Sequence, residues 1–208
     1  MLNINRLVLG PVATNCYVVS NEDTKEAIVI DPAEHAGKII KVLEKEGASL
    51  KAILLTHGHF DHMTAANELR EKTGAKLYAH EAEEELLKTP ELNLSMAFTG
   101  RSVSTEADVL VKDGEVLALA GMELKVIHTP GHTKGGCCYL LENQGILFSG
   151  DTLFQRTIGR TDFPTGDYQT LLDSVRKRLF VLNEEIKVLP GHNDTTTIAY
   201  EKKYNSEV

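Results

Sequence analysis

Three histidines and one aspartate stand within six residues of this chain, in the run Thr56-His57-Gly58-His59-Phe60-Asp61-His62. The run directly follows the apolar segment Ala52-Ile53-Leu54-Leu55, which is typical of a buried strand. Crowded imidazole and carboxylate groups are costly to bury unless they are paired or coordinate an ion. The chain has only eight histidines in 208 residues, so chance explains this spacing poorly. The run therefore predicts a metal-binding loop at a strand end.

Three more candidate ligands lie downstream, each in a tight turn after a strand-like stretch. They are His132 in Thr129-Pro130-Gly131-His132-Thr133, Asp151 in Ser149-Gly150-Asp151-Thr152, and His192 in Leu189-Pro190-Gly191-His192. Loops beyond the strand ends of a layered α/β fold are free of the packing demands on the sheet and are the usual place for sites. We expect four strand ends to bring ligands to one rim.

Seven ligands are too many for one tetrahedral ion, because a catalytic zinc usually keeps three protein ligands and one water. They suit two ions that share a carboxylate. Asp151 is the natural bridge, since it is the only carboxylate among the three downstream candidates. Our assignment gives the first ion His57, His59, His132 and Asp151, and the second ion Asp61, His62, Asp151 and His192. Two divalent ions are expected, zinc first, although this ligand set also accepts iron or manganese.

The motifs Thr-His-x-His-x-Asp-His, Pro-Gly-His-Thr, Ser-Gly-Asp-Thr-Leu-Phe and Pro-Gly-His resemble those of the metallo-β-lactamase superfamily, in the same order from Met1 to about Tyr204. The details around Gly150–Phe154 and Gly159–Asp162 are most similar to the glyoxalase II-like branch, the hydroxyacylglutathione hydrolases. The resemblance implies an α/β fold, a four-layer αβ/βα sandwich of two mixed sheets flanked by helices. It places the metals at the edge between the sheets, and the second stretch beside a thioester pocket.

The apolar periodicity predicts strands and helices compatible with that order. Helices are expected at 36–46, 64–72, 168–182 and 197–204, with Gly47 and Gly74 as C-terminal stops. Strands at 7–9, 17–19 and 27–30 open the first sheet; strands at 109–111, 116–118, 124–127, 137–141 and 146–148 form the second. Without a linker-like stretch, residues 1–208 are predicted to form a single domain.

The chemistry expected at such a centre is hydrolysis of a thioester by a metal-activated hydroxide, with one ion also polarising the substrate carbonyl. Asp61 would orient the hydroxide and accept or pass its proton. A thiolate leaves without a strong general acid. Arg160 is a candidate for gripping an anionic substrate group, because guanidinium matches carboxylate geometry; an ion pair with Asp162 is an equally good explanation of this residue.

Departures from the glyoxalase II pattern bear on the substrate. The chain ends shortly after His192, without the C-terminal extension that holds the glutathione carboxylate in longer members of that branch. Asp162 and Asp194 stand near positions that are usually aromatic there. An S-lactoylglutathione-type thioester is the first candidate substrate, and another thioester, a lactone or a small ester are the next candidates. The alternative is a persulfide dioxygenase, which the superfamily resemblance associates with one iron at His57, His132 and Asp151.

The remaining features limit the class of protein. A net charge of −8 disfavours a nucleic-acid surface, and no stretch resembles a signal peptide or a membrane span, so a cytoplasmic enzyme with a small-molecule substrate is expected.

The acidic clusters at 81–85 and 184–185 are predicted to be solvated, and the three cysteines to be buried and unpaired. His80 and His128 are expected in structural roles, and His35 has no predicted partner. The segment 89–105 is a lid or a dimer contact, and the oligomeric state is left open.

Overall fold

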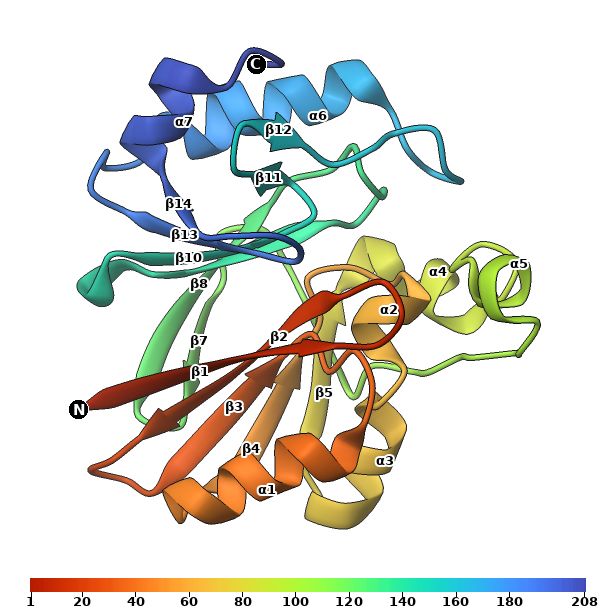
Figure 1. The fold of residues 1–208 in the computed structure, drawn as a ribbon, viewed down its shortest axis with the longest axis vertical. Helices are drawn as coiled ribbons and strands as arrows, with labels where there is room; N and C mark the ends of the chain where they lie inside the picture. Colours follow the sequence, from red (N-terminus) through yellow and green to blue (C-terminus); the bar gives the residue numbers. More distant parts are fainter.

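The computed structural model describes residues 1–208 as two six-stranded sheets packed face to face, with helices on both outer faces (Figure 1). The elements of the first sheet and its helices are β1 (Leu2–Leu9), β2 (Thr14–Asn21), β3 (Glu26–Ile30), α1 (Ala36–Glu46), β4 (Ser49–Leu54), α2 (Phe60–Met63), α3 (Ala66–Thr73), β5 (Lys76–His80), η1 (Glu81–Glu83), α4 (Glu84–Lys88), α5 (Ser95–Thr99) and β6 (Val109–Val111). The remaining elements are β7 (Val116–Leu119), β8 (Met122–His128), β9 (Cys137–Leu141), η2 (Glu142–Gln144), β10 (Ile146–Gly150), β11 (Leu153–Phe154), β12 (Thr157–Ile158), α6 (Tyr168–Ser174), η3 (Val175–Leu179), β13 (Lys187–Pro190), β14 (Thr196–Thr197) and α7 (Ile198–Tyr204).

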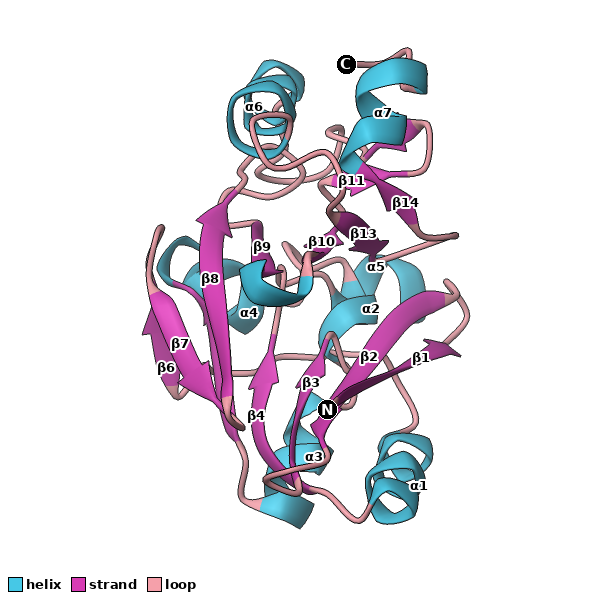
Figure 2. Ribbon diagram, turned by 90° about the vertical axis from the view of Figure 1, so that its left-hand side faces the viewer, coloured by secondary structure: helices cyan, strands magenta, loops and turns pink.

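Both sheets are mixed, which confirms the predicted fold class. The first has the order β1-β2-β3-β4-β5-β6; its first three strands are antiparallel and the pairs from β3 to β6 are parallel. The second has the order β14-β13-β10-β9-β8-β7, and only β10 and β13 run parallel. In the turned view of Figure 2, α1 and α3 lie at one end of the molecule and α6 and α7 at the other, with the sheets between them.

Strand alternation divides the buried residues among three layers. In β3, Val29 packs with α1 and α3, whereas Ile28 faces the other sheet. In β9, Cys137 lies in the layer between the sheets and Cys138 in the layer beneath α6. Each fully buried aliphatic side chain contributes about 1.5–3 kcal/mol through the hydrophobic effect. All three cysteines are buried and free, as predicted.

One strand was assigned to the wrong sheet. Residues Val109–Val111 form β6, which pairs in parallel with β5 at the edge of the first sheet and not with β7. The turn at Asp113–Gly114 is therefore the connection from one sheet to the other. A three-residue apolar strand carries no signal for its partner, because the pairing depends on which edge the preceding chain reaches.

The helices differ from the prediction mainly at their ends. Helix α1 has the predicted bounds and ends at Gly47, whose φ of 61° is left-handed. The helix expected at 64–72 is α3, which runs from Ala66 to Thr73. A further short helix that was not predicted, α2, lies before it within the metal loop, from Phe60 to Met63. The helix expected at 168–182 ends at Leu179, and its last turn is π-helical. None of the helices combines the length and apolar composition needed to cross a bilayer.

Candidate metal centre

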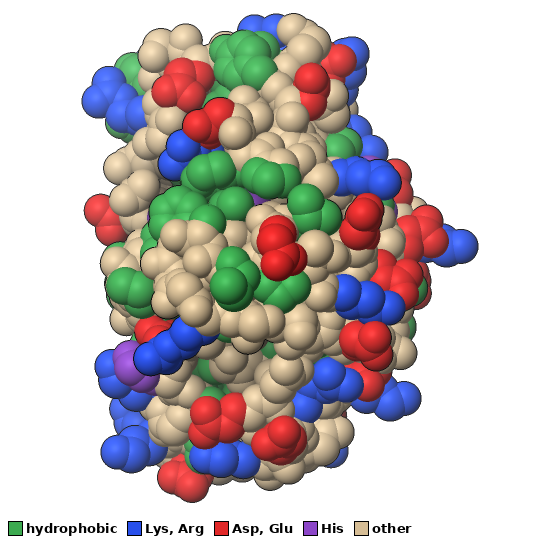
Figure 3. Space-filling model, turned by 90° about the vertical axis from the view of Figure 1, so that its right-hand side faces the viewer, with side chains coloured by type: hydrophobic (Ala, Val, Ile, Leu, Met, Phe, Trp, Pro, Cys, Tyr) green, Lys and Arg blue, Asp and Glu red, His purple; other side chains and the backbone are tan.

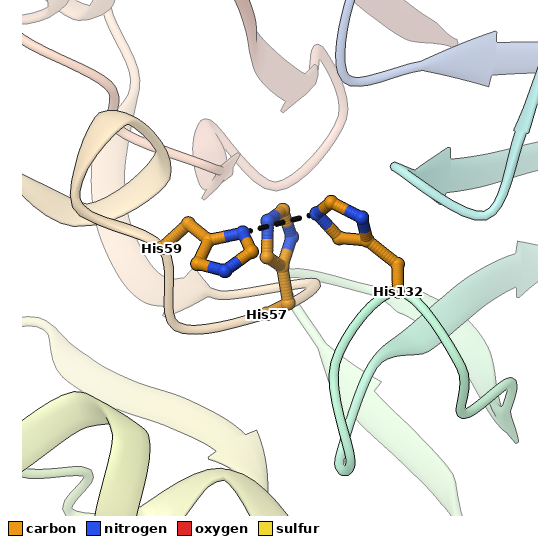
Figure 4. A group of neighbouring side chains, drawn as sticks. All are labelled: His57, His59 and His132. Atoms are coloured by element: carbon orange, nitrogen blue, oxygen red, sulfur yellow. Dashed lines mark hydrogen bonds between the residues drawn. The ribbon is translucent and has the colours of Figure 1, made fainter. Parts of the chain in front are cut away.

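The first donor group consists of three buried histidines. His57 and His59 lie in the loop after β4, and His132 lies in the loop after β8. Figure 4 shows the three imidazoles turned toward one another, with His59 Nδ1 3.0 Å from His132 Nε2. One donor atom from each residue lies within 4.8 Å of the other two. The β4 and β8 strand ends thus meet where the sequence predicted a common rim.

The second donor group contains a carboxylate and two histidines. Asp61 and His62 lie in the first turn of α2, and His192 follows β13. Asp61 Oδ2 is 3.4 Å from His62 Nε2 and 3.4 Å from His192 Nε2. The arrangement brings together the predicted second set, with two side chains from one turn of α2 and the third from the end of β13.

Asp151, which follows β10, lies between the two donor groups. Its Oδ2 atom is 3.5 Å from His132 Nε2 and 3.4 Å from His192 Nε2, while Oδ1 is 3.5 Å from His62 Nε2. Two donor atoms on one tetrahedral ion, each about 2.05 Å from the metal, are separated by roughly 3.3 Å. The observed separations are those of ligands around common ions. All seven predicted residues are therefore together, and their assignment as ligands remains our proposal.

Hydrogen bonds select the imidazole nitrogen that faces the centre. His132 Nδ1 donates to the Arg160 carbonyl at 2.7 Å, and His62 Nδ1 donates to Asp31 Oδ2 at 3.0 Å. Because carbonyl and carboxylate oxygens only accept, each of these rings keeps its proton on Nδ1 and leaves Nε2 free to bind. The buried Nε2 atoms of His57 and His62 and the Oδ1 atom of Asp151 have no hydrogen-bond partner in the protein. A divalent cation fits these unpartnered donors.

The two donor groups differ in charge. Burial lowers the pKa of His57 well below its usual range and that of His59 to about 3, so this group is neutral imidazole, the form that binds metals. Burial opposes the charge of His192 as well, but hydrogen bonds to Asp151 and Asp61 raise its pKa to about 9. A cation competes with that proton, and its affinity for the second group therefore rises with pH.

Glycines before two ligands allow the close approach. A Cβ atom on Gly191 would collide with Asp151 Oδ1 and His62, and one on Gly150 would collide with Thr56. Gly150 also has a φ of 50°, which is left-handed. The small residue beside each ligand is therefore required by the packing of the centre itself.

Two residues that position the proposed ligands were not predicted from the sequence, Asp31 and Thr14. Asp31, at the end of β3, accepts hydrogen bonds from Thr56 N at 2.8 Å, Thr56 Oγ1 at 2.7 Å and His62 Nδ1. Thr14 Oγ1 donates to Asp61 Oδ2 at 2.7 Å. The one signal for Asp31 was an aspartate directly after a buried strand, the same context as Asp151; Thr14 had none.

Asp31→Asn is expected to weaken binding of the second ion by about 10- to 100-fold. An asparagine amide can donate to His62 Nδ1, which would move the imidazole proton to Nε2 and block it as a ligand. Asparagine also tolerates the left-handed backbone at this position, where φ is 50°. Competition of the protein with a chromophoric zinc chelator measures the affinity. Asp108→Asn, whose carboxylate pairs with Arg70, is the matched control; equal affinities in both variants would contradict the assigned role.

Several predicted roles have definite outcomes. The Arg160 guanidinium makes two hydrogen bonds of 2.7 Å to Asp162. Of its two predicted roles, an ion pair with Asp162 and a grip on an anionic substrate group, the structure shows the ion pair. His80 and His128 stack with their centroids 4.0 Å apart, away from the donor groups, which confirms structural roles. His35 has a left-handed backbone and only a 3.8 Å contact with Glu34.

Glu83 contradicts the prediction that the cluster at 81–85 is solvated. It is 1% exposed and accepts a hydrogen bond from Thr133, the residue after His132. Its Oε2 atom has no partner. The helical turn η1 is thus fastened to the loop that carries His132, a contact that local charge patterning cannot reveal.

Glu83 is expected to make stability fall as pH rises. Burial raises its pKa from 4.5 to about 7, against hydrogen bonds from Thr133 and Gly135 that lower it. The unfolded chain releases this proton first, so the free energy of unfolding decreases between pH 4.5 and 7, by on the order of 3 kcal/mol. Urea unfolding at pH 5 and pH 8 measures the slope. Glu83→Gln is expected to reduce the change in the free energy of unfolding between the two pH values, and Glu85→Gln, at an exposed position, to leave this change as in the wild type. The same change in the wild type and in both variants would refute the prediction.

A cavity of about 380 Å³ opens beside the donor groups. Its lining includes the proposed ligands His59, Asp61, His132, Asp151 and His192. Residues from the segment 89–105 also line it, since Leu94 and Phe98 flank or lie in α5. This is the one large recess in contact with both donor groups, and the substrate carbonyl would enter here.

Comparison with known proteins identifies the family. Residues 9–192 match the model of the metallo-β-lactamase superfamily, and the chain belongs to that superfamily. Hydroxyacylglutathione hydrolase GloC from Haemophilus influenzae is 35% identical over 206 residues, which cover 98% of this chain and 97% of the relative. The fold, the donor set and this relative together place the chain among the metallo-hydrolases.

Three solved structures share the whole fold. BLEG-1 B3 metallo-β-lactamase has a TM-score of 0.93 and 39% identity, covering 99% of this chain and 98% of its own. TTHA1623 in a di-iron-bound form has a TM-score of 0.87 and 31% identity, covering 98% and 100%. ETHE1 from Myxococcus xanthus has a TM-score of 0.81 and 31% identity, covering 98% and 83%.

Proposed function

We propose that the protein hydrolyses a thioester at two divalent ions, with S-lactoylglutathione as the first substrate to test. The observation that carries the proposal is the position of Asp151, whose Oδ2 atom lies 3.5 Å from His132 in one donor group and 3.4 Å from His192 in the other. A shared carboxylate between two such groups supports a pair of ions. GloC supports the substrate class, and the di-iron form of TTHA1623 supports a second ion.

The residues would divide the work as follows. His57, His59 and His132 would hold one ion, Asp61, His62 and His192 the other, and Asp151 both. When bound, such ions lower the pKa of water toward neutrality and polarise a carbonyl. Zinc is the first candidate, and iron or manganese suit the same donors.

Asp61 would orient the attacking water. Burial raises its pKa, but the neighbouring His62 and His192 lower it to about 2, so the carboxylate stays ionised. Thr14 holds Oδ2 in place with a 2.7 Å hydrogen bond. An ionised, fixed carboxylate accepts a hydrogen bond from water and directs its lone pair at the carbonyl carbon. The water oxygen adds to the carbonyl carbon and gives up one proton to solvent. The C–S bond then breaks with its electron pair on sulfur, and the thiolate, whose conjugate acid has a pKa of about 8.5, needs no strong general acid to leave. The carboxylic acid formed loses the second proton to the thiolate or to solvent, which gives a carboxylate and a thiol.

A persulfide dioxygenase using one iron is the second candidate, because ETHE1 from Myxococcus xanthus shares the fold at 31% identity. Metal analysis combined with an anaerobic hydrolysis assay separates the two. Two ions per chain and release of free thiol from S-lactoylglutathione without oxygen support the thioesterase. One iron, oxygen consumption and sulfite from a persulfide support the dioxygenase. Lactone, simple ester and β-lactam substrates complete the screen, the last because of the BLEG-1 structure; hydrolysis of one of these alone would overturn the proposal.

A further inference from the structure

Aromatic side chains form one wall of the cavity beside the donor groups. The chain has six phenylalanines, and four of them, Phe60, Phe98, Phe154 and Phe163, line this cavity. Phe163 lies 5.8 Å from the ring of His59, Phe98 lies 5.8 Å from Phe163, and Phe60 stacks on Phe98 at 6.0 Å. The wall therefore runs without interruption from a proposed metal ligand to the surface.

The outer end of this wall is exposed to solvent. Phe98 is 59% exposed, and Val12, which also lines the cavity, is 44% exposed. Figure 3 shows hydrophobic side chains gathered in the middle of this face, around a small area of histidine. Large apolar groups that are exposed together next to a catalytic recess are typical of a surface that a ligand covers.

The segment that carries Phe98 is held in place. Asn93 Oδ1 accepts from Ser95 N at 3.0 Å and its Nδ2 donates to the Val103 carbonyl at 2.8 Å, so one side chain ties both ends of the α5 segment together. Asn93 also accepts from Phe60 N through its carbonyl at 3.0 Å. Phe98 is thus a built part of the wall.

Outside the proposed metal ligands, the cavity is lined by one cationic side chain, Arg160. Two hydrogen bonds of 2.7 Å join its guanidinium to Asp162. The same guanidinium lies 3.8 Å from the centroid of Phe163, where it extends the wall. An anionic group such as a glutathione carboxylate would meet the negative charge of Asp162 beside this guanidinium, whereas an uncharged group would not.

We infer that the preferred thioesters carry an uncharged, apolar group of aliphatic or aromatic character, which packs on Phe60, Phe98 and Phe163 next to the metal centre. This inference rests on the proposed thioester hydrolysis and ranks S-lactoylglutathione below uncharged substrates. The cavity of about 380 Å³ is near the lower end of the range for small-molecule sites, about 300–1,000 Å³, so the group is small.

The test varies the acyl and thiol sides separately. One arm compares S-phenylacetyl- with S-acetyl-N-acetylcysteamine, and the other compares the acetyl thioesters of benzyl mercaptan and N-acetylcysteamine, each corrected for its rate of alkaline hydrolysis. In one of the two comparisons, the apolar substrate is expected to have a kcat/KM about tenfold higher than its partner substrate. Phe98→Ala is expected to lower this preference for the apolar substrate about tenfold. The comparison in which Phe98→Ala changes the preference shows whether the acyl group or the thiol group of the substrate packs on the aromatic wall.

Met96→Ala is the matched control. Met96 is on the same short helix and is 43% exposed, but it does not line the cavity. The Met96→Ala variant is therefore expected to keep the wild-type preference for the apolar substrate. Binding of the non-hydrolysable S-phenethyl-N-acetylcysteamine to the metal-loaded proteins, measured by calorimetry, is expected to weaken about tenfold in Phe98→Ala alone. If neither arm prefers the apolar member, or if Phe98→Ala and Met96→Ala behave alike, the inference is overturned while thioester hydrolysis stands. If no thioester is hydrolysed, the proposed function fails instead.

A separate experiment tests the effect of the ion pair between Arg160 and Asp162 on substrate binding. Asp162→Asn releases Arg160, and the KM for S-lactoylglutathione is expected to fall about threefold, the size of one exposed ion pair. An unchanged KM would mean that Arg160 does not reach the substrate, and tighter binding of glutathione than of the uncharged substrates in the wild type would overturn the preference.

Discussion

Asp151→Asn is expected to lower kcat/KM for the best thioester by on the order of 10³-fold or more and to reduce the metal content from two ions to one or fewer per chain. The side chain keeps its size but loses the charge and one oxygen that lie between His132 and His192. Both donor groups lose a ligand at once, so the two ions are affected together. Metal quantification after gel filtration, with steady-state kinetics on the same sample, measures both effects.

The control for this variant is Asp173→Asn, on the surface of α6, where the carboxylate pairs with Lys177. It is expected to keep two ions and wild-type kinetics. Thermal unfolding followed by circular dichroism shows whether Asp151→Asn remains folded. A folded Asp151→Asn protein with two tightly bound ions and wild-type turnover would rule out the shared carboxylate.

Asp61→Ala is expected to lose the second ion alone, together with most turnover, on the order of 10²- to 10³-fold in kcat. The three-histidine group does not include Asp61, so the first ion is expected to bind with nearly wild-type affinity. Chelator competition then distinguishes this variant, with one strong site, from Asp151→Asn, in which both sites weaken. Near-wild-type hydrolysis by Asp61→Ala would contradict the proposed mechanism, and loss of both ions would contradict the division of the donors.

The candidate ligands that the structure brings together are those with a strong local signal in the sequence. His57, His59, Asp61 and His62 lie in one run, and the motifs around the other three ligands each follow an apolar strand and a glycine turn. The carboxyl ends of strands that run in the same direction lie at one edge of a sheet, so residues at those ends can be predicted to lie close together. The four-layer sandwich could be predicted because those motifs resemble the metallo-β-lactamase superfamily, and the order of predicted strands and helices is compatible with it.

The predictions that failed concern contacts between distant segments. Val109–Val111 was assigned to the wrong sheet because an edge strand of three residues pairs wherever the chain delivers it. Glu83 was expected in solvent, yet it is buried against the His132 loop, 50 residues away. The role of Asp31 as a hydrogen-bond acceptor was not predicted because its partner His62 belongs to another element. In each case the decisive neighbour is far away in the sequence.

By itself, the sequence determined the seven candidate ligands, their order and the strand ends that carry them, because imidazole and carboxylate chemistry and strand periodicity are local properties of the chain. Only the tertiary structure decided which nitrogen of His62 and of His132 faces the centre, and that the Arg160 guanidinium pairs with Asp162. It also assembled the aromatic wall from Phe60, Phe98 and Phe163, which have no common motif. Pairing and packing depend on which surfaces meet in space, and this is fixed when the two sheets close on each other.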